Sequence, residues 1–504
     1  MESMKSAKME GKTGALGSAF IFFGILFIIL FAFFTQVHPL VIYDGDDWGC
    51  LSDSRSALPK WGAWNPIKVL PEESFPIVGL IAAYFVMPFI QDYVISIVVT
   101  SAFIISGLIV CYVFLFSKVL ERRFSLNRYE VYALTLLFFL LHFIVFRPIN
   151  GVTPYLFGSG NLTCFFHYTI PGLVNFCVVE YFLAYGLPRT LSSSGKSIVS
   201  CAFLIFAVYL AIFSNVFHSI ILTAFVSVYF LVHDGKRLFH IKQWKSILKE
   251  YSFSVGILAV WFVSLIFEVN GGNAERIGAP FFALPIRQTL LAFWNVFKFS
   301  NIIVAVIAIL VLFAGGYCVK KCKRAGEDMT DLLKWIFVPV GSAVLTFVYL
   351  VLVSAKAAPG YIARGDVLIS VYGFLLIAIV GMLAFILEKH PKSFLAAPIV
   401  LFVVSCEVMG QTYPDGTIGR VSPKICYQID YDIINQVVTA SKAGQKEMVL
   451  RVPKHNGDNW PHPMYMGNAV SRTLYRHGLI NAPIKITIRP DAEMNKKYHI
   501  PVGK

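Results

Sequence analysis

The sequence has little charge and lacks the loops that bind nucleotide phosphates. Only 14% of its 504 residues are Asp, Glu, Lys or Arg. It contains no phosphate-cradling glycine loop and no dinucleotide fingerprint, so a cytosolic nucleotide-sugar enzyme is not expected. No His/Cys spacing resembles a zinc site. The absence of a visible internal repeat argues weakly against inverted-repeat transporters.

Apolar residues, in contrast, make up 57% of the chain and occur in separate runs that are each long enough to cross a bilayer. This pattern predicts an all-α polytopic membrane protein with about eleven spanning helices. Residues 76–91 are interrupted by Pro76 and Pro88, and we expect them to skim or re-enter the membrane. The predicted spans are 15–34, 93–117, 130–146, 170–187, a tight pair within 198–232, 252–268, 300–319, 335–354, 367–387 and 394–410.

The net charge of +14 is explained by basic residues in short loops on one side of this topology. The positive-inside rule places the basic N-terminal segment in the cytoplasm and the C-terminal segment on the opposite side. Loop bias accounts for the charge, so we expect membrane lipid and no nucleic acid as a partner. The first apolar run is too long and aromatic for a signal peptide, and no small-residue cleavage pattern follows it.

The C-terminal segment differs from the rest of the chain. Residues 1–410 form the predicted membrane domain, and residues 411–504 form a small extracytoplasmic α/β module. Apolar residues recur at helical spacing in 428–443 and 464–477, whereas 447–452 and 484–488 alternate as strands do. We expect this helix–strand–helix–strand module to dock on the membrane domain.

Three carboxylates follow the first span, at Asp44, Asp46 and Asp47. A carboxylate just outside the bilayer can deprotonate a hydroxyl or hold a divalent cation, whereas a solvated turn is the simpler interpretation. In an extended segment Asp46 and Asp47 face opposite sides. One of them is then catalytic and the other structural or substrate-binding. Asp44 and Asp46 share a face, which leaves a metal-binding pair as the alternative; otherwise no cofactor is expected.

The predicted first external loop, residues 35–92, contains further candidates for substrate binding. Tryptophan can stack on a sugar or anchor at the interface.

A lipid phosphate needs a cation at bilayer depth, and arginine can bind it with two hydrogen bonds. Arg364 is preferred because Gly360 and Gly365 flank it, but pairing with Asp366 is equally expected. The substrate-binding candidates are Arg55, Lys60, Trp61, Trp64, Lys68, Glu72, His167, Arg276, Lys356 and Arg364.

Three polar features fall elsewhere. Glu180 and His142 lie within predicted spans, where an ionisable residue is functional by default or makes a satisfied interhelical hydrogen bond. Residues 161–163 match an N-glycosylation acceptor sequence, which is a weak and common pattern.

Residues 44–48, 64–72 and 458–463, together with the architecture, resemble the GT-C class of integral-membrane glycosyltransferases. Within that class the chain is similar to the phage-encoded, serotype-converting O-antigen glucosyltransferases of Gram-negative bacteria. The resemblance implies a multi-pass protein of the bacterial inner membrane with a cytoplasmic N-terminus and a periplasmic C-terminus. It also implies that the acidic pair Asp46/Asp47 is the catalytic site, while no motif fixes the cation for the donor phosphate.

The implied reaction is an inverting transfer of a sugar, expected to be glucose, from undecaprenyl phosphate to an O-antigen hydroxyl of lipopolysaccharide. Two other classes are considered. An O-antigen polymerase or ligase would carry its signature in a large late loop rich in Arg and His. A lipid-linked-sugar transporter or flippase would carry charged residues along several helices.

Overall fold

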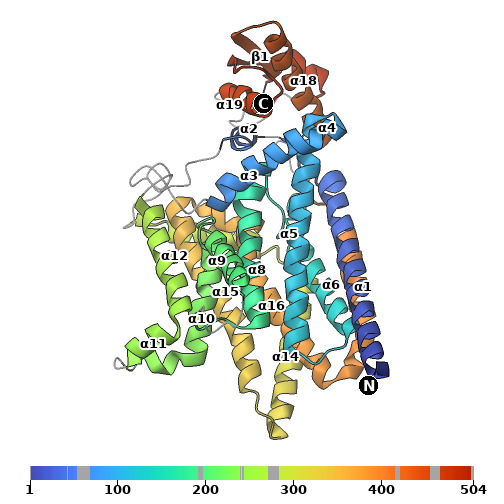
Figure 1. Ribbon diagram of the computed structural model, residues 1–504, viewed down its shortest axis with the longest axis vertical. Helices are drawn as coiled ribbons and strands as arrows, with labels where there is room; N and C mark the ends of the chain where they lie inside the picture. Colours follow the sequence, from blue (N-terminus) through green and yellow to red (C-terminus); the bar gives the residue numbers. More distant parts are fainter. Residues whose placement is uncertain are drawn as a thin grey trace.

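The structure is a computed structural model, and it describes residues 2–42, 44–53, 69–190, 197–238, 240, 243–270, 283–414, 421–454 and 466–500. These residues form a helical bundle with a small module at one end (Figure 1). The N-terminus lies at the opposite end of the bundle.

The described elements are mostly helices, and three short π-helical segments adjoin them. The bundle contains α1 (Glu2–Ala32), η1 (Phe33–Val37), α2 (Gly45–Cys50), α3 (Val69–Ile81), η3 (Ala82–Val86), α4 (Met87–Ile90), α5 (Tyr93–Arg123), α6 (Arg128–Ile144), α7 (Leu162–Cys164), η4 (Phe165–Thr169), α8 (Ile170–Tyr185), α9 (Ile198–Ile212), α10 (Ser219–Leu238), α11 (Trp244–Glu250), α12 (Ser252–Asn270), α13 (Ile286–Phe297), α14 (Ile302–Arg324), α15 (Thr330–Ala357), η9 (Pro359–Ala363), α16 (Gly365–Lys389), η10 (Pro391–Ala396) and α17 (Ala397–Met409). The module contains α18 (Pro423–Lys442), β1 (Glu447–Pro453), α19 (Gly467–Arg476), β2 (Lys485–Asp491) and α20 (Ala492–Lys497).

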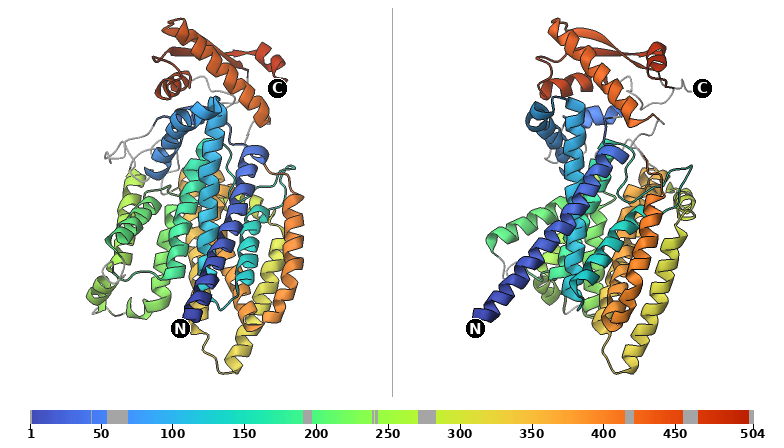
Figure 2. Two further views of the ribbon diagram at one scale, coloured as in Figure 1. Left: turned by 45° about the vertical axis from the view of Figure 1, so that its right-hand side comes forward. Right: turned by 90° about the vertical axis from the view of Figure 1, so that its right-hand side faces the viewer.

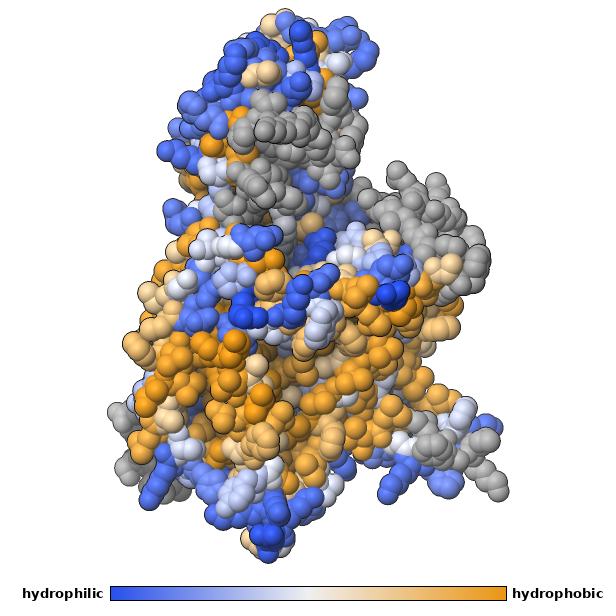
Figure 3. Space-filling model, turned by 180° about the vertical axis from the view of Figure 1, so that it is seen from behind, coloured by the Kyte–Doolittle hydropathy of each residue, from blue (hydrophilic) through white to orange (hydrophobic). Residues whose placement is uncertain are grey.

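The bundle belongs to a multi-pass membrane protein. Within the described residues, nine helical segments have the length and hydropathy needed to cross a bilayer, and a bent pair of helices is a tenth candidate. Figure 3 shows an apolar band across the middle of one face of the bundle, bordered by hydrophilic residues at both ends. Such a band is what a lipid-facing surface requires, because charged side chains are costly in the hydrocarbon region.

The predicted span count of eleven is not confirmed, because helix length varies around the bundle. α6 and α9 are shorter than the other candidates. The segment Leu70–Ile90 is long and apolar enough to span by composition alone. However, Figure 1 shows α3 and α4 lying across the upper ends of α5 and α8, as the predicted membrane-skimming helix would. The span predicted at 170–187 begins at Leu162, eight residues earlier than expected.

The module has the order of elements that the sequence predicts. β1 and β2 pair in parallel, from Glu447 opposite Lys485 to Pro453 opposite Asp491. The crossover between them contains α19, as a parallel pair requires. One face of α18 is buried against the strands, so the module has an apolar core of its own, formed by Ile429, Ile433, Val437, Leu450, Val452, Ile486 and Ile488.

The module sits directly above α2 and the α3–α4 segment, on the end of the bundle away from the N-terminus (Figures 1 and 2). Its helix α19 lies against α2. The acidic residues after the first span therefore lie between the bundle and the module, and this position defines the candidate site.

Candidate functional site

The three acidic residues lie in and around α2, a helix of six residues. Asp44 is its N-cap, and its side chain accepts a hydrogen bond from the backbone N–H of Asp46 at 3.0 Å. Asp47 completes a capping box by accepting from the backbone N–H of Asp44 at 3.0 Å. Acidic residues suit this position because they satisfy free N–H groups and the positive end of the helix dipole.

Two of the acids are tied to a second segment, residues 157–169. The carboxylate oxygen Oδ1 of Asp47 accepts from the backbone N–H of Thr163 at 2.7 Å and from its hydroxyl at 2.6 Å. Oδ2 of Asp44 accepts from the amide of Asn161 at 3.1 Å. Asp44 and Asp47 are buried. Every carboxylate oxygen of these two residues therefore accepts at least one hydrogen bond, and both residues hold α2 in place.

Asp46, in contrast, is exposed. The prediction of an extended segment is wrong, because the capping box folds these residues into a helix. Asp44 and Asp46 therefore do not share an open face, and the proposed metal-binding pair loses its geometric basis. Asp46 and Asp47 nevertheless have unequal environments, one open to solvent and one fully bonded.

Burial changes the ionisation of the neighbouring acids. Burial, and next the charge of Asp47, raises the pKa of Asp44 to about 6. Asp430 on α18 is also buried, and its pKa lies well above the usual range because of burial and then the charge of Asp47. The module thus contributes a fourth carboxyl group to the acidic cluster.

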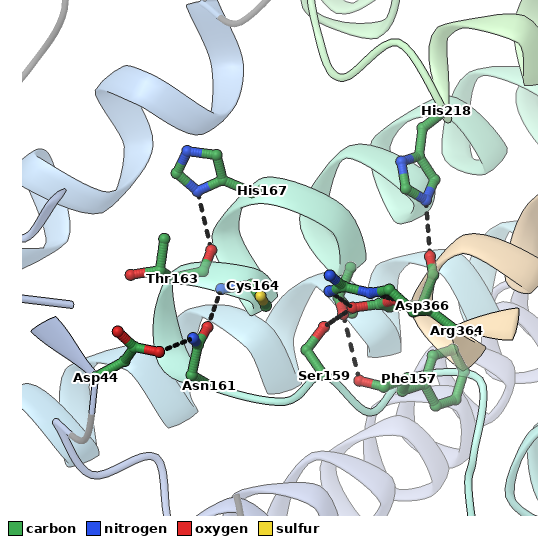
Figure 4. A network of polar contacts seen from close by, with 11 residues as sticks. Asp44, Phe157, Ser159, Asn161, Thr163, Cys164, His167, His218, Arg364 and Asp366 are labelled. Carbon is green, nitrogen blue, oxygen red and sulfur yellow. Dashed lines mark hydrogen bonds and ion pairs between the residues drawn. The ribbon is translucent and has the colours of Figure 1, made fainter. Parts of the chain in front are cut away.

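The same segment that holds α2 also reaches the predicted cation. The hydroxyl of Ser159 donates to Oδ2 of Asp366 at 2.6 Å. Asp366 accepts two hydrogen bonds from Arg364, from Nε at 2.9 Å and from Nη2 at 2.6 Å. His218 donates from Nε2 to the backbone carbonyl of Asp366 at 2.7 Å. Figure 4 shows these contacts on the one segment, with Asp44 at one side and Arg364 at the other.

Arg364 remains accessible despite its ion pair. Its guanidinium stacks over the ring of Tyr168 at 4.1 Å and lies 5.6 Å from the ring centre of Tyr361. Its side chain is 30% exposed, whereas Asp366 is buried. A guanidinium has five N–H donors and the ion pair uses two of them, so donors remain for an anion. The pairing with Asp366 and a phosphate-binding role are therefore compatible.

Glu72 and His167 form a smaller contact beside α2. Glu72 is in the first turn of α3, and its Oε1 lies 3.7 Å from Nε2 of His167. Nδ1 of His167 donates to the carbonyl of Thr163 at 2.9 Å, because a carbonyl can only accept. Thr163 therefore links the acidic helix to His167.

All π-helical segments of the described chain lie near this site. η1 ends shortly before α2, η3 lies in the skimming segment, and η4 carries His167. A π-helical turn widens the backbone and is frequent at functional sites. Their clustering is a second indication, independent of charge, that this end of the bundle carries a functional site.

The remaining predicted residues divide into two groups. Lys356 lies in the last turn of α15, which precedes η9. Six others lie outside the described residues: Arg55, Lys60, Trp61, Trp64, Lys68 and Arg276. The tail motif 458–463 also lies outside them.

The two intramembrane residues have different environments. Nε2 of His142 is hydrogen-bonded to the hydroxyl of Tyr112 at 3.0 Å, so His142 has the satisfied interhelical contact. Glu180 is fully buried, and within the described residues neither of its carboxylate oxygens has a hydrogen-bond partner.

The sequence pattern indicates the acids but not the residues that bind them. It marks Asn161 only as part of a weak glycosylation pattern, whereas the Asn161 side chain is buried and caps α7 by accepting from the N–H of Cys164 at 2.7 Å. A capping residue before a helical run is a readable signal. Ser159 and Thr163 carry no such signal, because their roles depend on tertiary contacts alone.

No family model, no curated protein and no solved structure matches this chain. The site must therefore be interpreted from its own geometry.

Proposed function

We propose that the protein is an inverting glycosyltransferase that uses a polyprenyl-phosphate sugar as its donor. The observation that carries the proposal is the network of Figure 4, in which one segment positions an acidic helix and a half-exposed arginine at the same end of a membrane bundle. A base for an acceptor hydroxyl and a cation for a leaving phosphate are the two groups that such a transfer needs.

Asp46 is the proposed base. It is the exposed member of the acidic cluster, while Asp44 and Asp47 are buried and bonded. Its carboxylate takes the proton of an O-antigen hydroxyl as that oxygen attacks the anomeric carbon from the face opposite the phosphate. The bond between the anomeric carbon and the phosphate oxygen then breaks, which inverts the configuration.

Arg364 is the proposed cation for the leaving polyprenyl phosphate. Negative charge grows on the phosphate as the bond breaks, and a fixed guanidinium stabilises that charge without reorganising. Asp366 and Tyr168 hold the guanidinium in one orientation. Undecaprenyl-phosphate glucose is the proposed donor, a lipopolysaccharide O-antigen on the periplasmic face is the proposed acceptor, and the polyprenyl chain stays in the bilayer.

The decisive experiment is transfer by the purified protein in vitro, with defined polyprenyl-phosphate sugars and an O-antigen acceptor. We expect Asp46→Asn to lower the rate by about 10²- to 10⁴-fold, the usual contribution of a general base, without changing thermal unfolding. The half-buried Asp432 on α18 pairs with Lys497 and is not part of the acidic cluster, so Asp432→Asn is the control. Full activity of the Asp46→Asn protein would remove the proposed base.

A transporter of lipid-linked sugars is the second candidate, and Glu180 favours it. A buried carboxyl group with neither oxygen hydrogen-bonded is a typical proton site in transporters. The two functions separate in liposomes that contain a labelled polyprenyl-phosphate sugar. Movement of the lipid between leaflets without an acceptor, lost in Glu180→Gln but kept in Asp46→Asn, would support the transporter.

A further inference from the structure

Helix α2 is too short to keep its own shape. It has six residues, and isolated helices shorter than about 12 residues are marginal in water. Its first turn is held by the capping box and by Asn161 and Thr163. Its last turn leaves carbonyl groups that need donors from elsewhere, as every helix end does.

Those donors come from α19 of the C-terminal module. The hydroxyl of Thr473 donates to the carbonyl of Trp48 at 2.6 Å. The hydroxyl of Ser52 lies 2.7 Å from that of Thr473 and must be the donor, because the single proton of Thr473 is already used. Arg476 donates from Nη1 to the carbonyl of Ser52 at 2.6 Å and pairs with Asp53.

Helix α19 is itself fixed to the bundle, so it can act as a rigid support. The hydroxyl of Tyr93 is hydrogen-bonded to Nδ1 of His477 at 2.6 Å. Tyr84 donates to the carbonyl of Arg476 at 2.7 Å. The imidazole of His477 packs so closely on Gly79 that a Cβ atom there would lie 3.0 Å from it. The support therefore connects α2 to α3, η3 and α5.

We propose that the C-terminal module completes the acidic site by capping the carboxyl end of α2. Thr473 and Arg476 are then positioning residues for Asp46, acting through the backbone of α2. Without the cap, the last turn of α2 frays. Because α2 has only six residues, Asp46 in its first turn then loses the helical turn that follows it and is held at its N-terminal side alone. The catalytic part of this inference rests on the proposed glycosyl transfer, whereas the cap itself does not.

The test compares three variants of the full-length protein. Thr473→Val keeps the shape but removes the donor, Thr473→Ser restores a hydroxyl, and Arg451→Ala breaks an ion pair with Asp491 elsewhere in the module. Hydrogen exchange of residues 44–53 reports the cap without any substrate. Transfer kinetics with polyprenyl-phosphate glucose report the effect on Asp46.

We expect Thr473→Val to speed exchange in residues 44–53 and to lower kcat by up to about 100-fold, with the KM for the lipid donor unchanged, because small displacements of a reacting group cost rate. Thr473→Ser and Arg451→Ala should behave as the wild type. A loss of activity that follows only the loss of folded protein, or a full kcat with faster exchange, would overturn the positioning role. If the wild-type protein transfers no sugar, the proposed function fails, and unchanged exchange in Thr473→Val would separately overturn the cap.

Discussion

The acidic helix α2 and the Arg364–Asp366 pair are charged groups at the same end of the bundle, but they are stabilised in different ways. In α2, like charges are brought together, and backbone and side-chain donors from the 157–169 segment satisfy the buried oxygens. In the pair, opposite charges neutralise each other and an aromatic ring covers one face of the guanidinium.

The difference indicates how one segment can position the proposed base and the proposed cation together. Ser159 and Thr163 lie four positions apart, and each donates to an acid on a different element. A displacement of this segment would therefore alter both groups at once. The arrangement leaves Asp46 exposed on one side and the remaining N–H groups of Arg364 on the other.

Apart from the effect of Asp46→Asn, the largest expected effect is that of removing the cation. Arg364→Ala should lower the transfer rate by about 10²- to 10³-fold, the usual cost of removing a donor that stabilises developing negative charge. Arg364→Lys should recover only part of the rate, because an ammonium cannot make the paired hydrogen bonds of a guanidinium. Initial rates with a polyprenyl-phosphate sugar measure both.

Arg287 provides the control, because it is an exposed arginine on α13, which packs against the neighbouring η9. Arg287→Ala should leave the rate unchanged. If Arg364→Ala only lowers the melting temperature and keeps its rate per folded molecule, the ion pair is structural. Arg364 then does not act with Asp46 in catalysis.

A smaller effect separates the two adjacent acids. Asp47→Asn replaces an acceptor by an N–H donor in a fully buried position, so a donor on Asp44 or Thr163 is left unsatisfied. The free energy of unfolding should fall by about 1–3 kcal/mol, which is the cost of one unsatisfied buried group. Thermal unfolding in detergent measures the change, and Asp46→Asn is the matched control. Equal stability of the two variants would contradict the assignment of a structural role to Asp47.

The smallest effect is a pH dependence from Asp44. Its pKa in the folded protein is about 6, above the ordinary value of 3.8, so the folded state favours the protonated carboxyl. The stability that this group contributes is present below pH 3.8 and is lost as the pH rises through about 6. Asp44→Asn should remove this dependence. The difference in melting temperature between wild type and variant should therefore change between these pH values. A constant difference would contradict the raised pKa of Asp44.

The periodicity of the sequence was sufficient to locate most of the fold. Apolar runs identify the long helices, and alternation in 447–452 and 484–488 identifies the two strands of the module, because each pattern depends on neighbouring residues. The shape of 69–90 and the short lengths of α6 and α9 depend on packing against other helices. Their treatment as spans could therefore not be decided from sequence.

The site was predictable only in part. The composition of residues 44–47 identified an acidic cluster, and flanking glycines favoured Arg364. However, the pattern Asp44-x-x-Asp47 resembles a capping box only when an acid is accepted at the third helical position, so an extended segment was expected. Thr163 and Thr473 are ordinary in sequence, and their roles arise from contacts across 116 and 425 positions.

The cap from α19 also bears on how the protein is made. Thr473 follows Trp48 by 425 positions, after all the described helices of the bundle. A ribosome-bound chain can insert its helices in order, but its acidic site stays unfinished until the module has been translated and has reached the same side of the membrane. The proposed cap therefore forms only after α19 has been translated, and a chain terminated before Thr473 would reach the membrane without a finished site.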